Sequence, residues 1–219
     1  MKIGILCTGR CGSTSLFEGI RNSIFNKKKY EYYFEPNRGI PRTEEEEKLD
    51  LPLYNITIDF SNNFILSKDL VNTIPGTIPY NYSLSTKDII YTLSNYYINY
   101  SKNFDIILLL MRQNELSAVQ SWDAVHRNNT FFEPWKFNSQ DMEIVYPIKK
   151  LDHIRNINDV MYNIAKQLKK PIIYYEDLFS GSKEFILNFI KEYNLPIENF
   201  DILYSYLDPK SKYNLRKNE

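Results

Sequence analysis

The chain has 219 residues, of which 43% are hydrophobic and 15% aromatic, and this composition is typical of a packed globular protein rather than of a disordered chain. Its 27 basic and 27 acidic residues cancel, which disfavours a nucleic-acid-binding protein or a polybasic membrane binder but leaves room for a local basic cluster that holds a polyanion. The length favours one domain over residues 1–219.

The cysteine count and the length of the apolar runs exclude further classes of protein. Cys7 and Cys11 are too few for a disulfide framework, and a lone Cys-x3-Cys pair lacks the second half of a zinc site, so we expect no metal site. No apolar run reaches the roughly 18 residues that a membrane span requires, and the apolar start of the chain is shorter than the core of a signal peptide. We therefore expect a cytoplasmic protein without a membrane partner.

Strand-like and helix-like patterns alternate along the chain. In chain order, we expect strands at residues 2–7, 31–34, within 56–67, at 104–111 and at 171–175. We expect helices over the segment that follows residue 12 and at residues 86–100, 114–127, 149–169 and 183–193. This alternation predicts an α/β fold with a mainly parallel sheet flanked by helices. The turns after residues 7, 34, 111 and 175 should meet at one edge of that sheet, where ligands bind.

The turn after the first strand is rich in groups that bind anions. A glycine-containing turn that opens into a helix points backbone N–H groups at one spot, where the helix dipole adds positive charge. The predicted phosphate cradle consists of Arg10, Cys11, Gly12, Ser13, Thr14 and Ser15. The alternative is an ordinary strand–helix turn in which a serine caps the helix.

The segment approaches the Walker A pattern of nucleoside triphosphatases without fitting it. Gly4 and Gly9 have the required spacing, but Arg10 and Cys11 replace the lysine and the hydroxyl residue that hold phosphate and magnesium. The strongest predicted strand ends in Arg112 rather than in an aspartate, and an arginine there suits an anion better than a metal.

Four segments together resemble the P-loop sulfotransferases, in particular the carbohydrate sulfotransferases. The segment Gly9–Leu16 is similar to their 5′-phosphosulfate loop. The other three segments are Leu109–Asn114 with the helix that follows, Ile172–Leu178, and Tyr33–Pro36. The resemblance implies a single-domain P-loop-type fold and 3′-phosphoadenosine-5′-phosphosulfate (PAPS) as sulfuryl donor, with adenosine 3′,5′-bisphosphate as product and no metal.

The resemblance also implies roles for individual residues around the donor. Arg112 and Ser121 would hold the 3′-phosphate, as a charged fork and a hydroxyl on one helix face. The family's serine stands eight residues after the arginine, a position held here by Gln120, so Gln120 and Ser117 remain alternatives to Ser121. Arg216 and Lys217 are similar to a segment that closes over the same phosphate, with a disordered basic tail as the alternative. The Tyr-Glu-Asp-Leu segment at 175–178 would orient the edge of the sheet.

Glu35 in the segment Tyr33-Phe34-Glu35-Pro36 is the candidate general base on the acceptor. Its alternative roles are those of a loop residue or of a structural ion pair. Glu133, in a second Phe-Glu-Pro segment, is a rival base. His126 and His153 do not stand where the histidine base of cytosolic members would, and we expect them to be surface or helix residues.

The expected reaction is in-line sulfuryl transfer to an acceptor hydroxyl, with Arg10 and Glu35 as catalytic residues. Segments 36–100 and 128–147 should form the acceptor site. A carbohydrate acceptor is favoured because the second segment contains four aromatic residues that can stack on sugar rings, Phe131, Phe132, Trp135 and Phe137. The alternatives are a P-loop kinase or nucleoside triphosphatase and a non-catalytic nucleotide-binding member of the fold.

Overall fold

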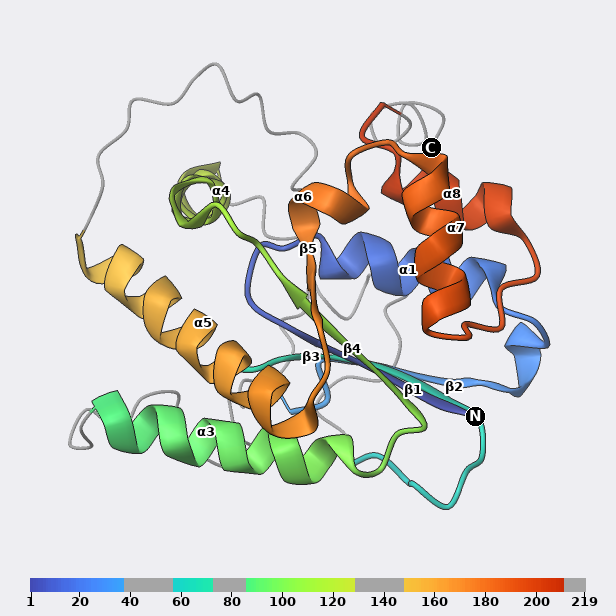
Figure 1. Ribbon diagram of the computed structural model, residues 1–219, viewed down its shortest axis with the longest axis horizontal. Helices are drawn as coiled ribbons and strands as arrows, with labels where there is room; N and C mark the ends of the chain where they lie inside the picture. Colours follow the sequence, from blue (N-terminus) through green and yellow to red (C-terminus); the bar gives the residue numbers. More distant parts are fainter. Residues whose placement is uncertain (38–56, 73–85, 129–147, 211–219) are drawn as a thin grey trace.

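The computed structural model describes residues 1–37, 57–72, 86–128 and 148–210. Its centre is a five-stranded sheet in the order β2-β3-β1-β4-β5, in which every neighbouring pair is parallel (Figure 1). The strands are β1 (Lys2–Cys7), β2 (Glu31–Phe34), β3 (Ile65–Leu70), β4 (Ile106–Met111) and β5 (Ile172–Tyr174). The expected α/β class with a parallel sheet flanked by helices in a single domain is confirmed.

Helices cover both faces of the sheet. They are α1 (Ser13–Ser23), α3 (Thr86–Ser101), α4 (Glu115–Asn128), α5 (Ile148–Leu168), α6 (Tyr175–Leu178), α7 (Lys183–Glu192) and α8 (Phe200–Leu207), with a short 3-10 turn η1 (Lys27–Lys29). Figure 1 shows α1, α7 and α8 on one face and α3 and α5 on the other. Each predicted helix is present to within two residues at the ends that were predicted, and Asn114 caps α4 as expected, because its Oδ1 accepts from Ser117 N at 3.0 Å.

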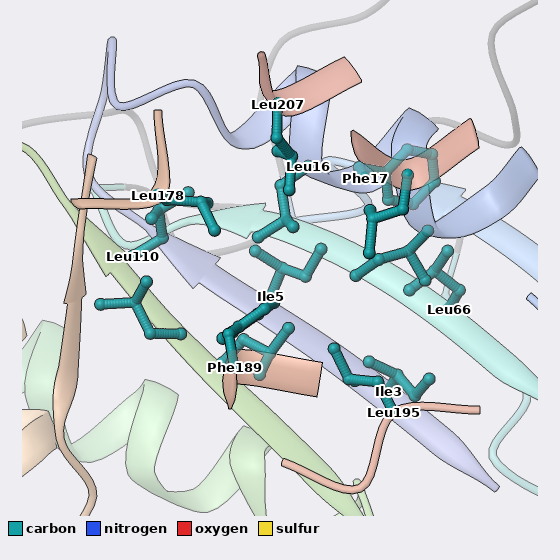
Figure 2. Packing of buried hydrophobic residues seen from close by; sticks show 14 of the residues in the cluster. Ile3, Ile5, Leu16, Phe17, Leu66, Leu110, Leu178, Phe189, Leu195 and Leu207 are labelled. Atoms are coloured by element: carbon teal, nitrogen blue, oxygen red, sulfur yellow. The ribbon is translucent and has the colours of Figure 1, made fainter. Parts of the chain in front are cut away.

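Two apolar layers hold the helices on the sheet. Ile3 and Ile5 of β1 pack with Leu16 and Phe17 of α1 and with side chains of α7 and α8 (Figure 2). Leu6 of β1 points to the opposite face, where it belongs to a second cluster built from α3 and α5. Because the strands are buried on both faces, β1 and β4 consist of continuous apolar runs rather than of alternating ones.

Three elements differ from the sequence expectation. β3 extends to Leu70, beyond the predicted limit of 67, because the charged residues Lys68 and Asp69 are buried and partnered inside the strand. β5 ends at Tyr174 and the chain turns at once into α6. The helix α8 was not predicted; it is capped by Asn199, whose Oδ1 accepts from Ile202 N at 3.1 Å. Within the described residues, none of the helices combines the length and apolar character needed to cross a bilayer.

Candidate active site

The carboxyl ends of all five strands lie at one edge of the sheet, because all neighbouring strands are parallel. The segments that follow Cys7, Phe34, Leu70, Met111 and Tyr174 therefore leave the sheet at this edge, as the sequence predicted for four of them. Most of the residues that the sequence singled out stand in these segments or in the first turns of the helices that follow.

The loop between β1 and α1, Thr8–Gly12, is tightly folded. Thr8 N donates to Leu110 O at 3.1 Å, and Cys11 Sγ donates to Thr8 O at 2.8 Å. Arg10 and Gly12 both have a positive φ, 62° and 75°. At Gly12 a Cβ atom would stand 2.4 Å from Cε2 of Phe179, so the position requires glycine both for its backbone angle and for its space.

Gly12, rather than a serine, is the N-cap of α1, and this cap includes no side-chain hydrogen bond. The alternative of a serine-capped turn is therefore wrong. Amides in the first turn of a helix have no partner within the helix, and the dipole makes their end positive. Ser13 and Ser15 are buried here, while Thr14 is exposed.

Arg10 reaches from this loop to α4. Its Nε donates to Ser121 Oγ at 3.1 Å, in a part-buried contact between residues 111 positions apart in sequence. Ser121, one of the three candidate polar residues on α4, is thus in contact with Arg10.

Arg112, at the end of β4, is the second cation of the site. Its Nη1 donates to Arg10 O at 3.4 Å, and its guanidinium carbon lies 4.6 Å from the centre of the Tyr175 ring. Its Nε is buried and has no hydrogen-bond partner. Burial, and then the charge of Arg112, lower the pKa of Arg10. Within the described part of the chain, no carboxylate forms an ion pair with either arginine.

The Tyr-Glu-Asp-Leu segment fixes the place of these groups. The Glu176 carboxylate accepts from Gln113 N and from Asn114 N, both at 3.0 Å, and so ties α6 to the start of α4. Tyr175 stacks on Phe179, with ring centres 4.6 Å apart, and both rings crowd Gly12. The sequence predicted an orienting role for this segment but did not assign the Tyr175 ring to the site.

Glu35 lies on the other half of the edge, immediately after β2. It has a φ of 50°, is buried, and forms an ion pair with Lys68 of β3. Lys68 also lies over the Phe34 ring, 4.4 Å from its centre, and its carbonyl accepts from Glu35 N at 2.6 Å. The structural ion pair that the sequence left as an alternative for Glu35 is therefore present, and Lys68 is a site residue that sequence reasoning missed.

Asp69 anchors a buried polar network beside this pair. Its carboxylate accepts from Asn37 N and Asn37 Nδ2, both at 3.1 Å, and from Tyr100 OH at 2.7 Å. Tyr96 OH donates to Asn37 Oδ1 at 2.8 Å. Burial raises the pKa of Asp69 to about 7, against the lowering effect of its hydrogen-bond donors. The one signal in the sequence was a charged Lys-Asp pair inside an otherwise apolar strand.

The two cysteines belong to the walls of the site. Both are free and fully buried, and Cys7 Sγ donates to Asp69 O at 3.0 Å. Burial raises the pKa of the Cys7 thiol. The Cys11 thiol bonds to its own loop, so this residue can offer a ligand its backbone N–H rather than its side chain. Among the described residues, no three or more His, Cys, Asp or Glu side chains are grouped so that they could hold a metal ion.

Several predicted residues lie outside the described part of the chain. These are the rival base Glu133, the aromatic residues of segment 128–147, and the pair Arg216 and Lys217. His126 lies on α4 in a stretch whose side chains are not described, and His153 lies on α5, where burial lowers its pKa. Comparisons of this chain with protein-family models, with curated proteins and with solved structures found no match.

Proposed function

We propose that this protein is a P-loop-type sulfotransferase that moves the sulfuryl group of PAPS to an acceptor hydroxyl. The observation that carries the proposal is the cation pair of Arg10 and Arg112. The two guanidinium groups belong to neighbouring segments beside the N-terminus of α1, whose glycine cap makes no side-chain hydrogen bond, and neither has an ion-pair partner in the described chain. Two partly buried like charges are unfavourable unless an anion joins them, so the arrangement favours a ligand with more than one negative group.

The residues present fit such a donor. The amides at the start of α1, with Ser13, Thr14 and Ser15 nearby, suit the 5′-phosphosulfate group. Arg112 and Ser121 suit a second phosphate, because the buried Nε of Arg112 lacks an acceptor and Ser121 already lies 3.1 Å from Arg10. A nucleotide with phosphates at both ends of its ribose would satisfy both groups at once.

The donor would supply the sulfuryl group. The acceptor oxygen forms the new bond to sulfur as the bond from sulfur to the bridging phosphate oxygen breaks, and the electron pair stays on that oxygen. Arg10 would neutralise the charge that grows there, and Glu35 would hold the proton lost by the acceptor. The buried Lys68 pairs with the Glu35 carboxylate and holds it at the edge of the sheet. A carbohydrate acceptor remains the favoured class.

A magnesium-dependent kinase or triphosphatase is the second candidate, and one observation favours it. Asp69 is the next-to-last residue of β3, the strand beside β1, so a carboxylate does stand near the loop. Both of its oxygens, however, accept hydrogen bonds from Asn37 or Tyr100, and the residue is 1% exposed. A metal ligand needs an open lone pair that faces the phosphates, so this geometry favours a structural carboxylate.

Calorimetric titration with adenosine 3′,5′-bisphosphate and with ATP, in EDTA and then in magnesium, tests the proposal. We expect micromolar or tighter binding of the bisphosphate in EDTA and little binding of ATP. If ATP binds once magnesium is added and the bisphosphate does not bind at all, the proposal is wrong. Binding without any consumption of PAPS, across a panel of hydroxyl acceptors, would instead identify a non-catalytic member of the fold.

A matched pair of variants locates the second phosphate. We expect Arg112→Ala to weaken bisphosphate binding at least tenfold, since a charged hydrogen bond is worth about 1.5–3 kcal/mol. It should leave the weaker binding of adenosine 5′-phosphosulfate, which lacks the 3′-phosphate, nearly unchanged. Arg155→Ala, which removes an exposed arginine on α5 that pairs with Glu115, is the control and should alter neither affinity.

A further inference from the structure

The segment that follows β2 contains Glu35, Pro36 and Asn37 in consecutive positions, all buried. Two sets of contacts hold this segment to β3. At its start, Glu35 N donates to Lys68 O at 2.6 Å and the Glu35 carboxylate pairs with Lys68. At its end, Asn37 donates twice to the Asp69 carboxylate. The Glu35 backbone has a positive φ of 50°, a conformation that a residue with a side chain keeps only when its surroundings hold it there.

We propose that Asp69 is a positioning residue for the general base, whose carboxylate clasps Asn37 and thereby holds the strained Glu35 backbone in its working position. This inference rests on the proposed function for the role of Glu35, but the clasp itself can be tested without it. We name the contact between Asp69 and Asn37, supported by Tyr100 and Tyr96, the Asp69 clasp.

The clasp consists of several hydrogen bonds that act on one side chain rather than of a single bond. One carboxylate oxygen accepts from the Asn37 backbone, and the other accepts from Asn37 Nδ2 and from Tyr100 OH. Tyr96 stacks on Tyr100, with ring centres 6.1 Å apart and an angle of 11°, and its hydroxyl holds the amide oxygen of Asn37. Every polar atom of the Asn37 side chain therefore has a partner that fixes its orientation.

The clasp should depend on the ionised form of Asp69. The two Asn37 groups can only donate, so a proton on the oxygen that either of them faces weakens that contact, whereas Tyr100 OH can accept from Asp69 and donate to Ser67 instead. The titratable groups that face Asp69 are Glu35 after β2, Lys68 of β3, Cys7 of β1, and Tyr96 and Tyr100 of α3. Since burial raises the pKa of Asp69 to about 7, the clasp should tighten as the pH rises through neutrality.

The amide substitution Asp69→Asn tests the clasp because it replaces one of the two accepting oxygens by an NH₂ group, which faces an Asn37 donor in either orientation of the amide. The exchanged double variant Asn37→Asp/Asp69→Asn restores a carboxylate–amide pair with the roles reversed. In this double variant the Asn37→Asp carboxylate can accept from Tyr96, and Tyr100 can donate to Ser67, whose Oγ lies 3.3 Å away. Asp201→Asn, at an exposed carboxylate in the first turn of α8, is the matched control.

The first measurement is amide hydrogen exchange of the segment 31–37, expressed as protection factors between pH 6 and 8. In the wild-type protein we expect protection at the end of this segment to increase with pH. In Asp69→Asn we expect it to fall at least tenfold and to lose its pH dependence, with recovery in the exchanged double variant. Unchanged protection in Asp69→Asn overturns the clasp. If that variant does not fold, Asn37→Ala, which removes the Nδ2 donor and the Oδ1 acceptor of Tyr96 but keeps the Asn37 backbone donor, should show the same loss in part.

The second measurement separates the clasp from the proposed function. Hydrolysis of PAPS, with water as the acceptor, should fall at least tenfold in Asp69→Asn at pH 8, and the wild-type inflection near pH 7 should disappear. The dissociation constant for adenosine 3′,5′-bisphosphate should stay within twofold. Normal hydrolysis by Asp69→Asn at every pH overturns the positioning role. A wild-type protein that neither binds the bisphosphate nor consumes PAPS overturns the proposed function, while the exchange data still decide whether the clasp exists.

Discussion

The charged residues on the two halves of the sheet edge differ in their partners. On the half formed by β1, β4 and β5, Arg10 and Arg112 lie together, and no carboxylate in the described chain pairs with them. On the half formed by β2 and β3, Glu35 pairs with Lys68, and the Asp69 carboxylate accepts three hydrogen bonds. Buried charge without a partner is costly and suits a site that awaits a ligand, whereas partnered charge fixes the backbone. We call the first half, which holds the proposed binding site, the binding half; the second half holds Glu35.

The largest expected effect is on the partnered half. Lys68→Met removes the cation from a pair in which the lysine side chain is 2% exposed and the Glu35 side chain 11% exposed. A charge left alone in such a place destabilises a protein by about 3–5 kcal/mol. Urea unfolding at pH 7.5 should show this loss directly.

The double variant Lys68→Met/Glu35→Gln is the control for that prediction. It removes both charges, so most of the lost stability should return. A Lys68→Met protein that loses less than about 1 kcal/mol would mean that water already reaches the pair, and the contrast between the two halves would fail.

The next effect concerns the pH dependence of stability, through Asp69. Burial raises the pKa of this carboxyl to about 7, so between roughly pH 4 and 7 the folded protein holds a proton that the unfolded chain has lost. Stability contributed by this group is therefore greatest at low pH and declines as the pH rises to about 7. The shift corresponds to about 4 kcal/mol at most.

The measurement is the difference in unfolding free energy between the wild type and Asp69→Asn, taken at several pH values from 5 to 8. The asparagine does not titrate, so the wild type should lose stability relative to the variant as the pH rises. A difference that stays constant across this range would contradict the raised pKa, and a difference of the opposite sign would mean that the hydrogen bonds outweigh burial.

A smaller effect is expected at the loop that begins the binding half. Gly12→Ala introduces a Cβ atom 2.4 Å from the Phe179 ring at a residue with φ of 75°. Left-handed backbone costs about 1–2 kcal/mol and overpacking about 1–3 kcal/mol, so we expect a loss of about 3 kcal/mol.

Gly181→Ala provides a matched control for Gly12→Ala. Gly181 has a similar φ of 81°, but its nearest neighbour would be 3.8 Å from the new Cβ. Thermal unfolding should therefore show only the backbone cost, about 1–2 kcal/mol. Equal losses in the two variants would mean that the Tyr175 and Phe179 rings can move away from the new Cβ atom and do not restrict the loop.

The contrast between the halves also explains what the sequence could predict. Apolar runs and turn residues predicted four of the five strands nearly to the residue, and the order of the chain placed Arg10, Arg112 and Ser121 near one another. These signals are local or belong to a short motif. Lys68 and Asp69 were missed because their burial depends on partners such as Glu35 and Tyr100, which stand 31–33 positions away in sequence. No pattern within a single strand distinguishes a buried charged residue with a distant partner from an exposed one.

The smallest effect on stability is expected from Arg112→Ala, although this residue has a central place in the proposed binding site. The change removes a guanidinium that lies 4.6 Å from the Tyr175 ring centre, a contact worth about 0.5–1 kcal/mol. It also removes the buried Nε that has no acceptor and the repulsion that lowers the pKa of Arg10. These terms oppose one another, so we expect a net change within about 1 kcal/mol. Urea unfolding in low salt, with and without adenosine 3′,5′-bisphosphate, measures both the stability of the ligand-free protein and the stabilisation by the ligand. The ligand should stabilise the wild type and have little effect on the variant. If the ligand-free variant instead loses as much stability as Lys68→Met, then Arg112 holds the fold as Lys68 does, and the binding half loses its distinguishing feature.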